Sequence, residues 1–413
     1  MNRTEFAQRV SRRALLSASA ASSFWLTEKL AFAAPSGAAP PLTLVCIFLR
    51  GAVDGLSLVV PHAEPAYYKA RPTLAIAPPK HQGGALDLDG RFGLHPRLGA
   101  LKPAFDAGEL GFVHAVGSPH PTRSHFEAQD YMETATPGER RRDGWLGRCV
   151  PEQAAGALRL PRVALSPRTP LALRGNGSVL STPGLDRFQL RAPGGLRPRI
   201  ETAFAQMYGE EPSVAARAGS DALSVAAQLH ELGVADYKPE HGAAYDKSQT
   251  QLRDTAFLIK ADLGLRVAWI DLGGWDTHQG QGNADKGRLA PLLAGLGGGL
   301  AAFRRDLGPR LEQVVVLVMS EFGRTVEENG TQGTDHGHGN MMMLLGGRVR
   351  GKKVHGHFPG LAPEQRYEGR DLAVTTDFRD VFAEVAQHLG STELGAVLPG
   401  YAFDDKRRLG VLR

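Results

Sequence analysis

The chain has 413 residues, of which 42% are hydrophobic and 22% are charged, and its formal net charge is +5. These fractions are typical of a globular protein that buries a core. Its two cysteines are too few for a disulfide-dense scaffold or a Cys₄ metal site. No apolar run approaches the roughly 20 residues that span a bilayer. Whether the positive charge indicates nucleic-acid binding depends on where the basic residues lie.

Much of the positive charge lies in residues 1–33, where five basic and two acidic residues contribute +3 of the total. The paired Arg12 and Arg13 precede a weakly apolar stretch, and residues 31–33 (Ala-Phe-Ala) match a cleavage signal. This order predicts a twin-arginine signal peptide read by the export machinery, and hence a periplasmic or otherwise exported protein. An N-terminal amphipathic helix of a cytosolic protein is the alternative. A linker over 34–41 and one domain over 42–413 would follow.

The remaining chain has no basic run or aromatic-interleaved basic stripe of the kind typical of nucleic-acid-binding proteins, so the sequence predicts no nucleic-acid partner. Apolar runs and helical spacing predict alternating strands and helices. In chain order we expect a strand at 42–49, a helix at 96–107, a strand at 110–116, helices at 124–134 and 145–150, an irregular segment at 151–197 with at most a small hairpin, helices at 213–232 and 243–263, a strand at 265–272, a helix at 284–307, strands at 313–319 and 341–345, and a helix at 377–389.

This alternation predicts an α/β fold with a mainly parallel central sheet and helices on both faces. The run 42–49 is apolar throughout, which is typical of a strand buried on both faces. Cys46 lies within that run and is therefore expected to be a buried thiol. In an oxidising compartment a bridge to Cys149 is the alternative.

Polar residues follow three of the predicted strands, at 42–49, 265–272 and 313–319. In an open α/β sheet, ligands bind beyond the carboxyl ends of the strands. Carboxylate oxygens and imidazole nitrogens without thiolates suit a divalent metal, for which we expect zinc, with manganese, calcium or magnesium as alternatives. The predicted metal ligands are Asp54, Asp276, His278, Glu321, Asp335, His336 and His338.

Several of these residues also have structural explanations. Asp54 could form a turn, Asp276 could cap a helix, and Glu321 could pair with Arg324. The expected nucleophile is Ser124, although Ser124 and Glu127 also match a helix capping box, and Thr122 is the second candidate. Three arginines are expected to bind a substrate anion near this hydroxyl: Arg50, Arg123 and Arg324.

Five motifs resemble the bacterial family named domain of unknown function 1501, over about residues 42–389. They are FLRGAVDGLSLVVP, HAVGSPHPTRSHFEAQDYMET, GGWDTH, SEFGRT and TDHGHGN. That family is similar to the alkaline-phosphatase/sulfatase superfamily, an α/β sandwich with one or two metals at strand ends. The resemblance implies that Asp54 is the first metal ligand, that Ser124 is the nucleophile, and that Asp276 and His278 are later ligands.

One position departs from the superfamily pattern. Its Asp-His-Gly would fall on Glu321, Phe322 and Gly323, and phenylalanine cannot ligate a metal. His336 or His338 would then have to supply the histidine. The resemblance implies an exported metal-dependent hydrolase of phosphate or sulfate esters, with a small or polymeric anionic substrate. A catalytically silent metal- or anion-binding protein on the same fold is the alternative, which Phe322 favours.

Overall fold

The computed structural model describes residues 42–150, 160–175, 177–189, 193, 195–209 and 213–413. The predicted signal peptide (1–33) and linker (34–41) lie outside the described residues. Among the residues that are described, every helix is too short or too polar to cross a membrane.

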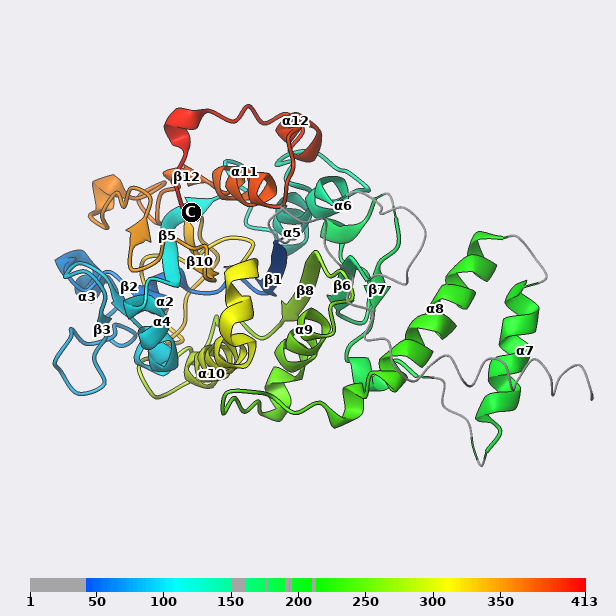
Figure 1. Ribbon diagram of the computed structural model, residues 1–413. Coiled ribbons are helices and arrows are strands. Elements are labelled where there is room, and N and C mark those ends of the chain that lie inside the picture. The colour runs from blue at the N-terminus through cyan, green and yellow to red at the C-terminus, as the bar shows by residue number, and fades with distance from the viewer. Residues whose placement is uncertain (1–41, 151–159, 176, 190–192, 194, 210–212) are drawn as a thin grey trace, which may run out of the picture. The chain divides into compact units, whose positions relative to one another are not determined.

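A nine-stranded sheet forms the centre of the structure (Figure 1). Its strands are β1 (Thr43–Leu49), β5 (Leu110–Gly117), β6 (Arg162–Leu165), β7 (Leu180–Ser181), β8 (Val267–Leu272), β9 (Val314–Met319), β10 (Asn340–Leu345), β11 (Val354–His355) and β12 (Thr376–Asp377). The spatial order is β11-β5-β10-β9-β1-β8-β6-β7, and β12 pairs with β5. Within this sheet, every pair of described strands is parallel except those of β10 with β5 and β9, so the predicted mainly parallel α/β sheet is confirmed.

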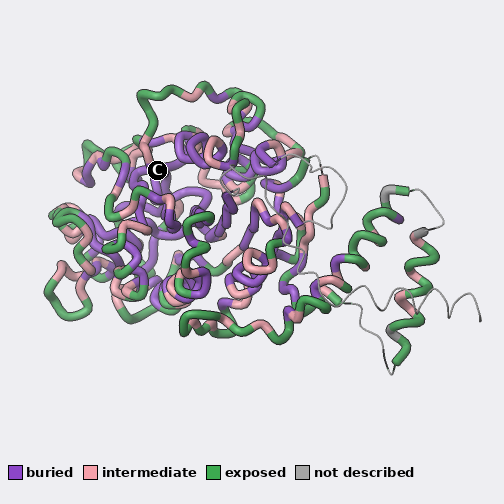
Figure 2. Tube along the Cα trace, in the orientation of Figure 1, coloured by how far each residue is buried: buried purple, intermediate pink, exposed green. Residues whose placement is uncertain are grey.

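Helices cover both faces of this sheet. On one face lie α9 (Thr250–Lys260) and α10 (Leu289–Leu307), and on the other α6 (Trp145–Cys149) and α11 (Phe378–His388), below and above the strands in Figure 1. Side chains of β1 alternate between the two cores: Val45, Ile47 and Leu49 face α9 and α10, whereas Leu44, Cys46 and Phe48 face α6 and α11. The central strands β1 and β9 are accordingly buried along their whole length, in the interior that Figure 2 shows in purple.

The remaining elements are short or peripheral. The helices are α2 (Gly55–Leu58), α3 (Pro65–Ala70), α4 (Lys102–Asp106), α5 (His125–Thr134), α7 (Arg197–Gly209), α8 (Val214–Glu231) and α12 (Leu394–Val397). The 3₁₀ helices are η1 (Pro96–Leu101), η2 (Leu171–Leu173), η3 (Leu185–Arg187), η4 (Val234–Asp236), η5 (Lys247–Gln249), η6 (Gly308–Gln313), η7 (Pro363–Gln365) and η8 (Asp405–Arg407). A second sheet has the order β2-β4-β3 and consists of β2 (Val59–Val60), β3 (Leu86–Asp87) and β4 (Gly93–Leu94).

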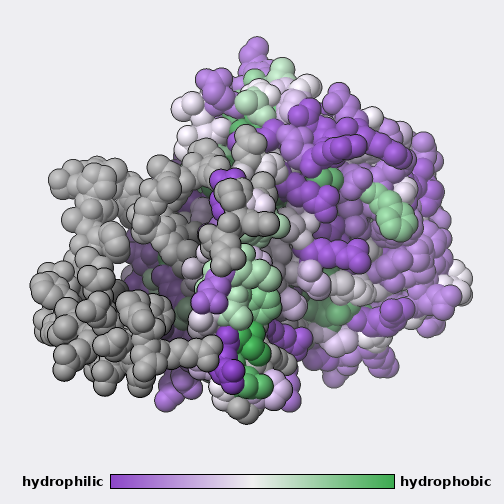
Figure 3. Space-filling model, turned by 90° about the vertical axis from the view of Figure 1, so that its right-hand side faces the viewer, coloured by the Kyte–Doolittle hydropathy of each residue, from purple (hydrophilic) through white to green (hydrophobic). Residues whose placement is uncertain are grey.

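The surface around α7 carries apolar side chains among mostly polar ones (Figure 3). Leu196 and Met207 are 43% and 54% exposed. This helix was not among the predicted elements, although Ile200, Ala203, Phe204 and Met207 follow one another at helical spacing.

Residues 151–197 differ from the expected irregular segment. Within its described part, β6 and β7 pair with each other in parallel, and β6 joins the main sheet beside β8. The predicted small hairpin is therefore wrong, since a hairpin requires antiparallel strands. Cys46 is buried as expected, and both Cys46 and Cys149 are free thiols. Burial raises the pKa of Cys46, and it raises that of Cys149 to about 12.

Strand direction determines which loops meet. β1, β8 and β9 run in parallel, and β5 shares their direction because both β5 and β9 are antiparallel to β10. The carboxyl ends of these four strands therefore lie at one edge of the sheet. The amino end of β10 lies at the same edge, which brings the loop before Asn340 to the loops that follow the other strands.

Candidate metal centre

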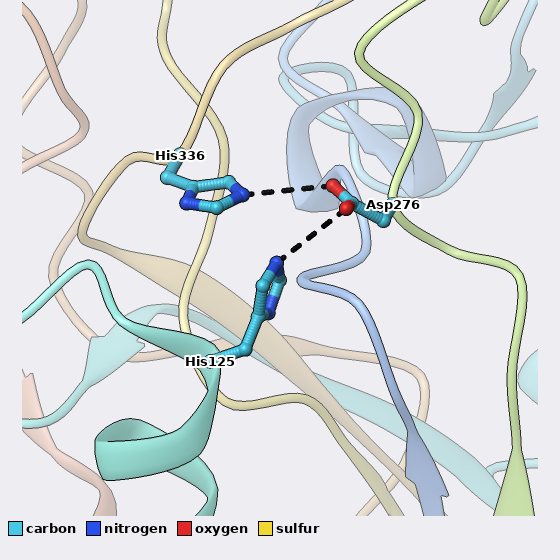
Figure 4. Close-up of side chains that lie close together, drawn as sticks. All are labelled: His125, Asp276 and His336. Atoms are coloured by element: carbon cyan, nitrogen blue, oxygen red, sulfur yellow. Dashed lines mark ion pairs between the residues drawn. The ribbon is translucent and has the colours of Figure 1, made fainter.

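Three histidines surround one carboxylate at this edge. His125 is the first residue of α5, Asp276 and His278 follow β8, and His336 precedes β10. The rings of His125 and His336 point toward the carboxylate of Asp276 (Figure 4), with Nε2 to oxygen distances of 3.7 and 3.6 Å. The Nε2 of His278 lies 3.1 Å from Asp276 Oδ1 and 2.9 Å from the Nε2 of His336. Four side chains from three separate segments thus converge.

The outer nitrogen of each ring faces a hydrogen-bond acceptor. The acceptors are Glu321 Oε1 for His125 (2.7 Å), Asp335 Oδ1 for His278 (2.9 Å) and the carbonyl oxygen of Arg123 for His336 (2.9 Å). A carboxylate or carbonyl oxygen can only accept, so each Nδ1 carries the hydrogen. In the neutral rings, the lone pair is then on Nε2, the atom that faces Asp276. Histidines that bind metals are held in this way by a carboxylate or carbonyl behind the ring.

The inner nitrogens lack ordinary hydrogen-bond partners. His278 and His336 both donate from Nδ1, so their Nε2 lone pairs oppose each other across 2.9 Å unless a proton or a cation lies between them. The Nε2 of His125 is buried and has no hydrogen-bond partner among the described residues. The ligand atoms of His125, Asp276 and His336 lie within 4.8 Å of one another. These three side chains could together hold a divalent ion, and the Nε2 of His278 lies beside them, 2.9 Å from that of His336.

Arg324 fixes the position of the Asp276 carboxylate. Its buried guanidinium donates to Asp276 Oδ1 and to the carbonyl oxygens of Gly51 and Ala52. Burial raises the pKa of Asp276, but Arg324 and the neighbouring histidines outweigh it, and the pKa lies below its usual value. Gly51 has a φ of +117°, and a Cβ there would lie 2.6 Å from the backbone nitrogen of Asp276. The close approach of these two loops therefore requires glycine.

Glu321 holds His125 instead of facing Asp276. Its Oε1 accepts hydrogen bonds from His125 Nδ1, from Gln129 Nε2 at 2.8 Å and from the backbone nitrogen of Gly51 at 2.9 Å. Burial raises the pKa of Glu321, but these hydrogen bonds lower it to about 2, so the carboxylate is charged. Phe322 stacks on the ring of His125 with centroids 5.0 Å apart. Glu321 and Phe322 therefore both position His125.

The other predicted ligands have different surroundings. Asp335 supports His278 from behind, and buried His338 stacks on Tyr367 with centroids 4.4 Å apart. Asp54 is fully buried and pairs with Arg71 at 2.6 Å. Among the described residues its carboxylate also accepts from Ser57 and Gln281, and none of its hydrogen bonds involves the histidine cluster. Burial raises the pKa of Asp54, but the charge of Arg71 and the hydrogen bonds to the carboxylate outweigh burial, and the pKa lies below its usual value.

The expected nucleophiles lie directly before His125. Ser124 is the N-cap residue of α5, but its side chain makes no capping hydrogen bond. The hydroxyl of Thr122 donates to Glu127 Oε2 at 2.7 Å. The expected capping box between Ser124 and Glu127 is therefore absent from this described helix, and Thr122 takes the place of Ser124 as the partner of Glu127.

The three arginines expected to bind an anion are each paired with carboxylates. Arg50 pairs with Glu133 and Asp271, both at 2.8 Å. The Nη2 of Arg123 pairs with Glu368 Oε2 and with Asp371 Oδ2, both at 2.6 Å. Arg324 binds Asp276 as described above. Their guanidinium groups support the loops around the histidine cluster.

His125 is the residue that sequence reasoning missed. It lies in the segment predicted to supply the nucleophile, directly after Ser124, and no role was predicted for its imidazole. A histidine at the start of a helix that follows a predicted strand, in the same motif as the suspected nucleophile, was the available signal. Its contact with Glu321, 196 positions away, depends on tertiary packing.

The model of a family described as "Protein of unknown function (DUF1501)" matches residues 109–391. No curated protein matches this chain. Similar solved structures include Ps i-CgsB in complex with k-i-k-neocarrahexaose, at 11% identity and a TM-score of 0.37, covering 89% of this chain and 74% of that chain. The PH0037 protein from Pyrococcus horikoshii has 11% identity and a TM-score of 0.25, covering 75% of this chain and 87% of that chain. At these scores the likeness carries no inference about activity.

Proposed function

The chain belongs to the DUF1501 family, and we propose that it is a zinc-dependent hydrolase of phosphate or sulfate esters. One observation carries this proposal: the Nε2 atoms of three histidines meet at the carboxylate of Asp276, and each ring is held from behind by an acceptor. The position beyond the carboxyl ends of parallel strands is where α/β proteins bind ligands.

His125, Asp276, His278 and His336 would hold the zinc ion. When bound, the ion would supply a Lewis acid that polarises an ester oxygen and stabilises negative charge in the transition state. The side chains of Asp276 and His278 are 46% and 39% exposed, so an ester in solution can reach them. This exposure favours a reactive site over a closed structural one.

Ser124 is the proposed nucleophile: its Oγ would bond to phosphorus or sulfur as the bond to the alcohol breaks, and its proton would pass to the departing alkoxide. Water would then hydrolyse the seryl ester, releasing phosphate or sulfate and restoring the hydroxyl. It directly precedes His125, and its hydroxyl makes no capping hydrogen bond. Thr122 is less suited, because its hydroxyl already donates to Glu127.

We also propose an alkaline-phosphatase/sulfatase-like sandwich, exported through a twin-arginine signal at residues 1–33. The mainly parallel sheet with helices on both faces supports the first part. The arginine pair and cleavage signal in the sequence support the second. Replacing Arg12 and Arg13 by lysine is expected to retain the precursor in the cytoplasm, and fractionation followed by immunoblotting would detect this. Unchanged export would contradict the signal assignment.

A catalytically silent metal-binding protein is the second candidate. It is favoured by the pairing of Arg50, Arg123 and Arg324 with carboxylates, which leaves none of these three as an obvious clamp for a substrate anion. This candidate shares the histidine cluster and differs in having no turnover.

The metal content of the purified protein tests the shared premise. We expect about one zinc per chain by mass spectrometry of the metal, and loss of most of it in His336→Ala. His338→Ala is the matched control, because this histidine lies two residues away and stacks on Tyr367. A protein that binds no zinc, manganese or other divalent ion would rule out both candidates. Bound zinc without turnover of aryl phosphates or aryl sulfates would favour the silent protein.

A further inference from the structure

A cavity of about 820 Å³ opens beside the histidine cluster. The helix α5 connects the two, because His125 contributes to the cluster while Gln129 and Glu133, one and two turns further on, line the cavity. One helical turn is about 5.4 Å, so the cavity begins within roughly 6 Å of His125 along the helix. Gln129 bridges them directly: it donates to Glu321 at 2.8 Å and accepts from Arg50 at 2.9 Å.

Positive charge predominates on the cavity wall. The charged lining residues are Arg50, Arg141, Arg142, Arg168 and Arg174 against Asp130, Glu133 and Asp271. Glu133 and Asp271 both pair with Arg50, and Arg141 pairs with Asp143. These pairs leave three other arginines facing one carboxylate, that of Asp130.

Two of those arginines have no partner in the described structure. Arg142 and Arg168 are exposed, and neither forms an ion pair or a side-chain hydrogen bond with another described residue. Arg174 donates to the carbonyl oxygen of Thr169. Guanidinium groups match the oxygens of phosphate and sulfate in pairs of hydrogen bonds.

We propose that this cavity binds a second phosphate or sulfate group of the substrate whose ester lies at the histidine cluster. The inference rests on the proposed function and narrows it: the substrate is a multiply charged phosphate or sulfate ester. Arg142 and Arg168 bind its second anionic group, and α5 sets the distance between that group and the reacting ester.

Calorimetric titration of the mature protein with tripolyphosphate and with dextran sulfate tests this proposal. Arg142→Gln/Arg168→Gln is expected to weaken binding of at least one polyanion by about tenfold or more, since it removes two guanidinium groups that form charged hydrogen bonds with an anion. Arg305→Gln/Arg310→Gln is the control, because it removes the same charge from exposed positions outside the cavity lining. The polyanion that binds identifies phosphate or sulfate as the preferred group.

Two outcomes would overturn the proposal: no binding of either polyanion, or equal loss in the cavity and control variants. The variant His336→Ala distinguishes anion binding in the cavity from the proposed hydrolase activity. This variant lacks a proposed zinc ligand, and it is expected to keep polyanion binding because the arginines are unchanged. A protein that binds a polyanion through Arg142 and Arg168 but hydrolyses no ester would therefore contradict the proposed hydrolase activity and still support anion binding in the cavity.

Discussion

The orientation of His125 depends on a single buried carboxylate. Glu321 accepts the Nδ1 hydrogen of His125, which leaves Nε2 to face Asp276. Glu321→Gln keeps the shape but removes the charge, so the imidazole becomes a weaker ligand. We expect zinc affinity to fall by about 10–100-fold, as is typical when such supporting residues are replaced. Competition with a chromogenic chelator measures this change.

Glu327→Gln is the control for that measurement, since Glu327 is an exposed carboxylate that pairs with Arg366. Unchanged zinc affinity in Glu321→Gln would mean that His125 is not held for metal binding. Equal loss in both variants would point to a general effect of charge.

Part of this site was accessible from the sequence. The sequence placed Asp276 and His278 directly after a predicted strand, and His336 in the loop before another. The structure brings these three side chains together. Asp54 also follows a strand, yet its carboxylate turns toward Arg71. Sequence position places a residue at the edge of the sheet, but the direction of its side chain depends on partners distant in the chain.

At the scale of elements, long apolar runs were predicted well and short strands poorly. β1 and β9 consist of seven and six buried residues, so their pattern is unmistakable. β7 has two residues, too few to show any period. The antiparallel direction of β10 was also not predicted, because the run Asn340–Leu345 reads the same in either direction. Because β10 is antiparallel to its neighbours, its amino end, and with it His336, lies at the same edge as the loops that hold His125 and Asp276.

Two glycines of α10 differ in how closely neighbouring elements pack against them, and therefore in how an alanine would affect stability. A Cβ on Gly297 would lie 3.2 Å from the Cα of Leu98 in η1, whereas a Cβ on Gly295 would meet its nearest atom, in Ser248, at 3.6 Å. We expect Gly297→Ala to destabilise the protein by about 1–3 kcal/mol through overpacking. Gly295→Ala should stabilise it by about 0.5–1 kcal/mol, because alanine favours the helix. Urea unfolding gives both values, and stabilisation by both variants would contradict close packing at Gly297.

At the scale of the whole molecule, the proposed ligands connect segments that are far apart in the sequence. His125 follows β5, Asp276 follows β8 and His336 precedes β10, so a bound ion would link three loops that separate on unfolding. An ion that binds the folded chain alone stabilises it by about 4.1 kcal/mol at a concentration 1,000 times its Kd. In a domain of this size that free energy corresponds to a rise in Tm of about 5 °C.

We therefore expect zinc to raise the Tm of the chelator-treated protein by about that amount in differential scanning calorimetry. His336→Ala should lose most of this rise, because it removes the ligand that β10 brings to the cluster. His338→Ala should keep it, even if its starting Tm is lower, since that ring contacts Tyr367. An equal zinc response in the two variants would contradict the ligand assignment, and no response in the unaltered protein would contradict the site itself.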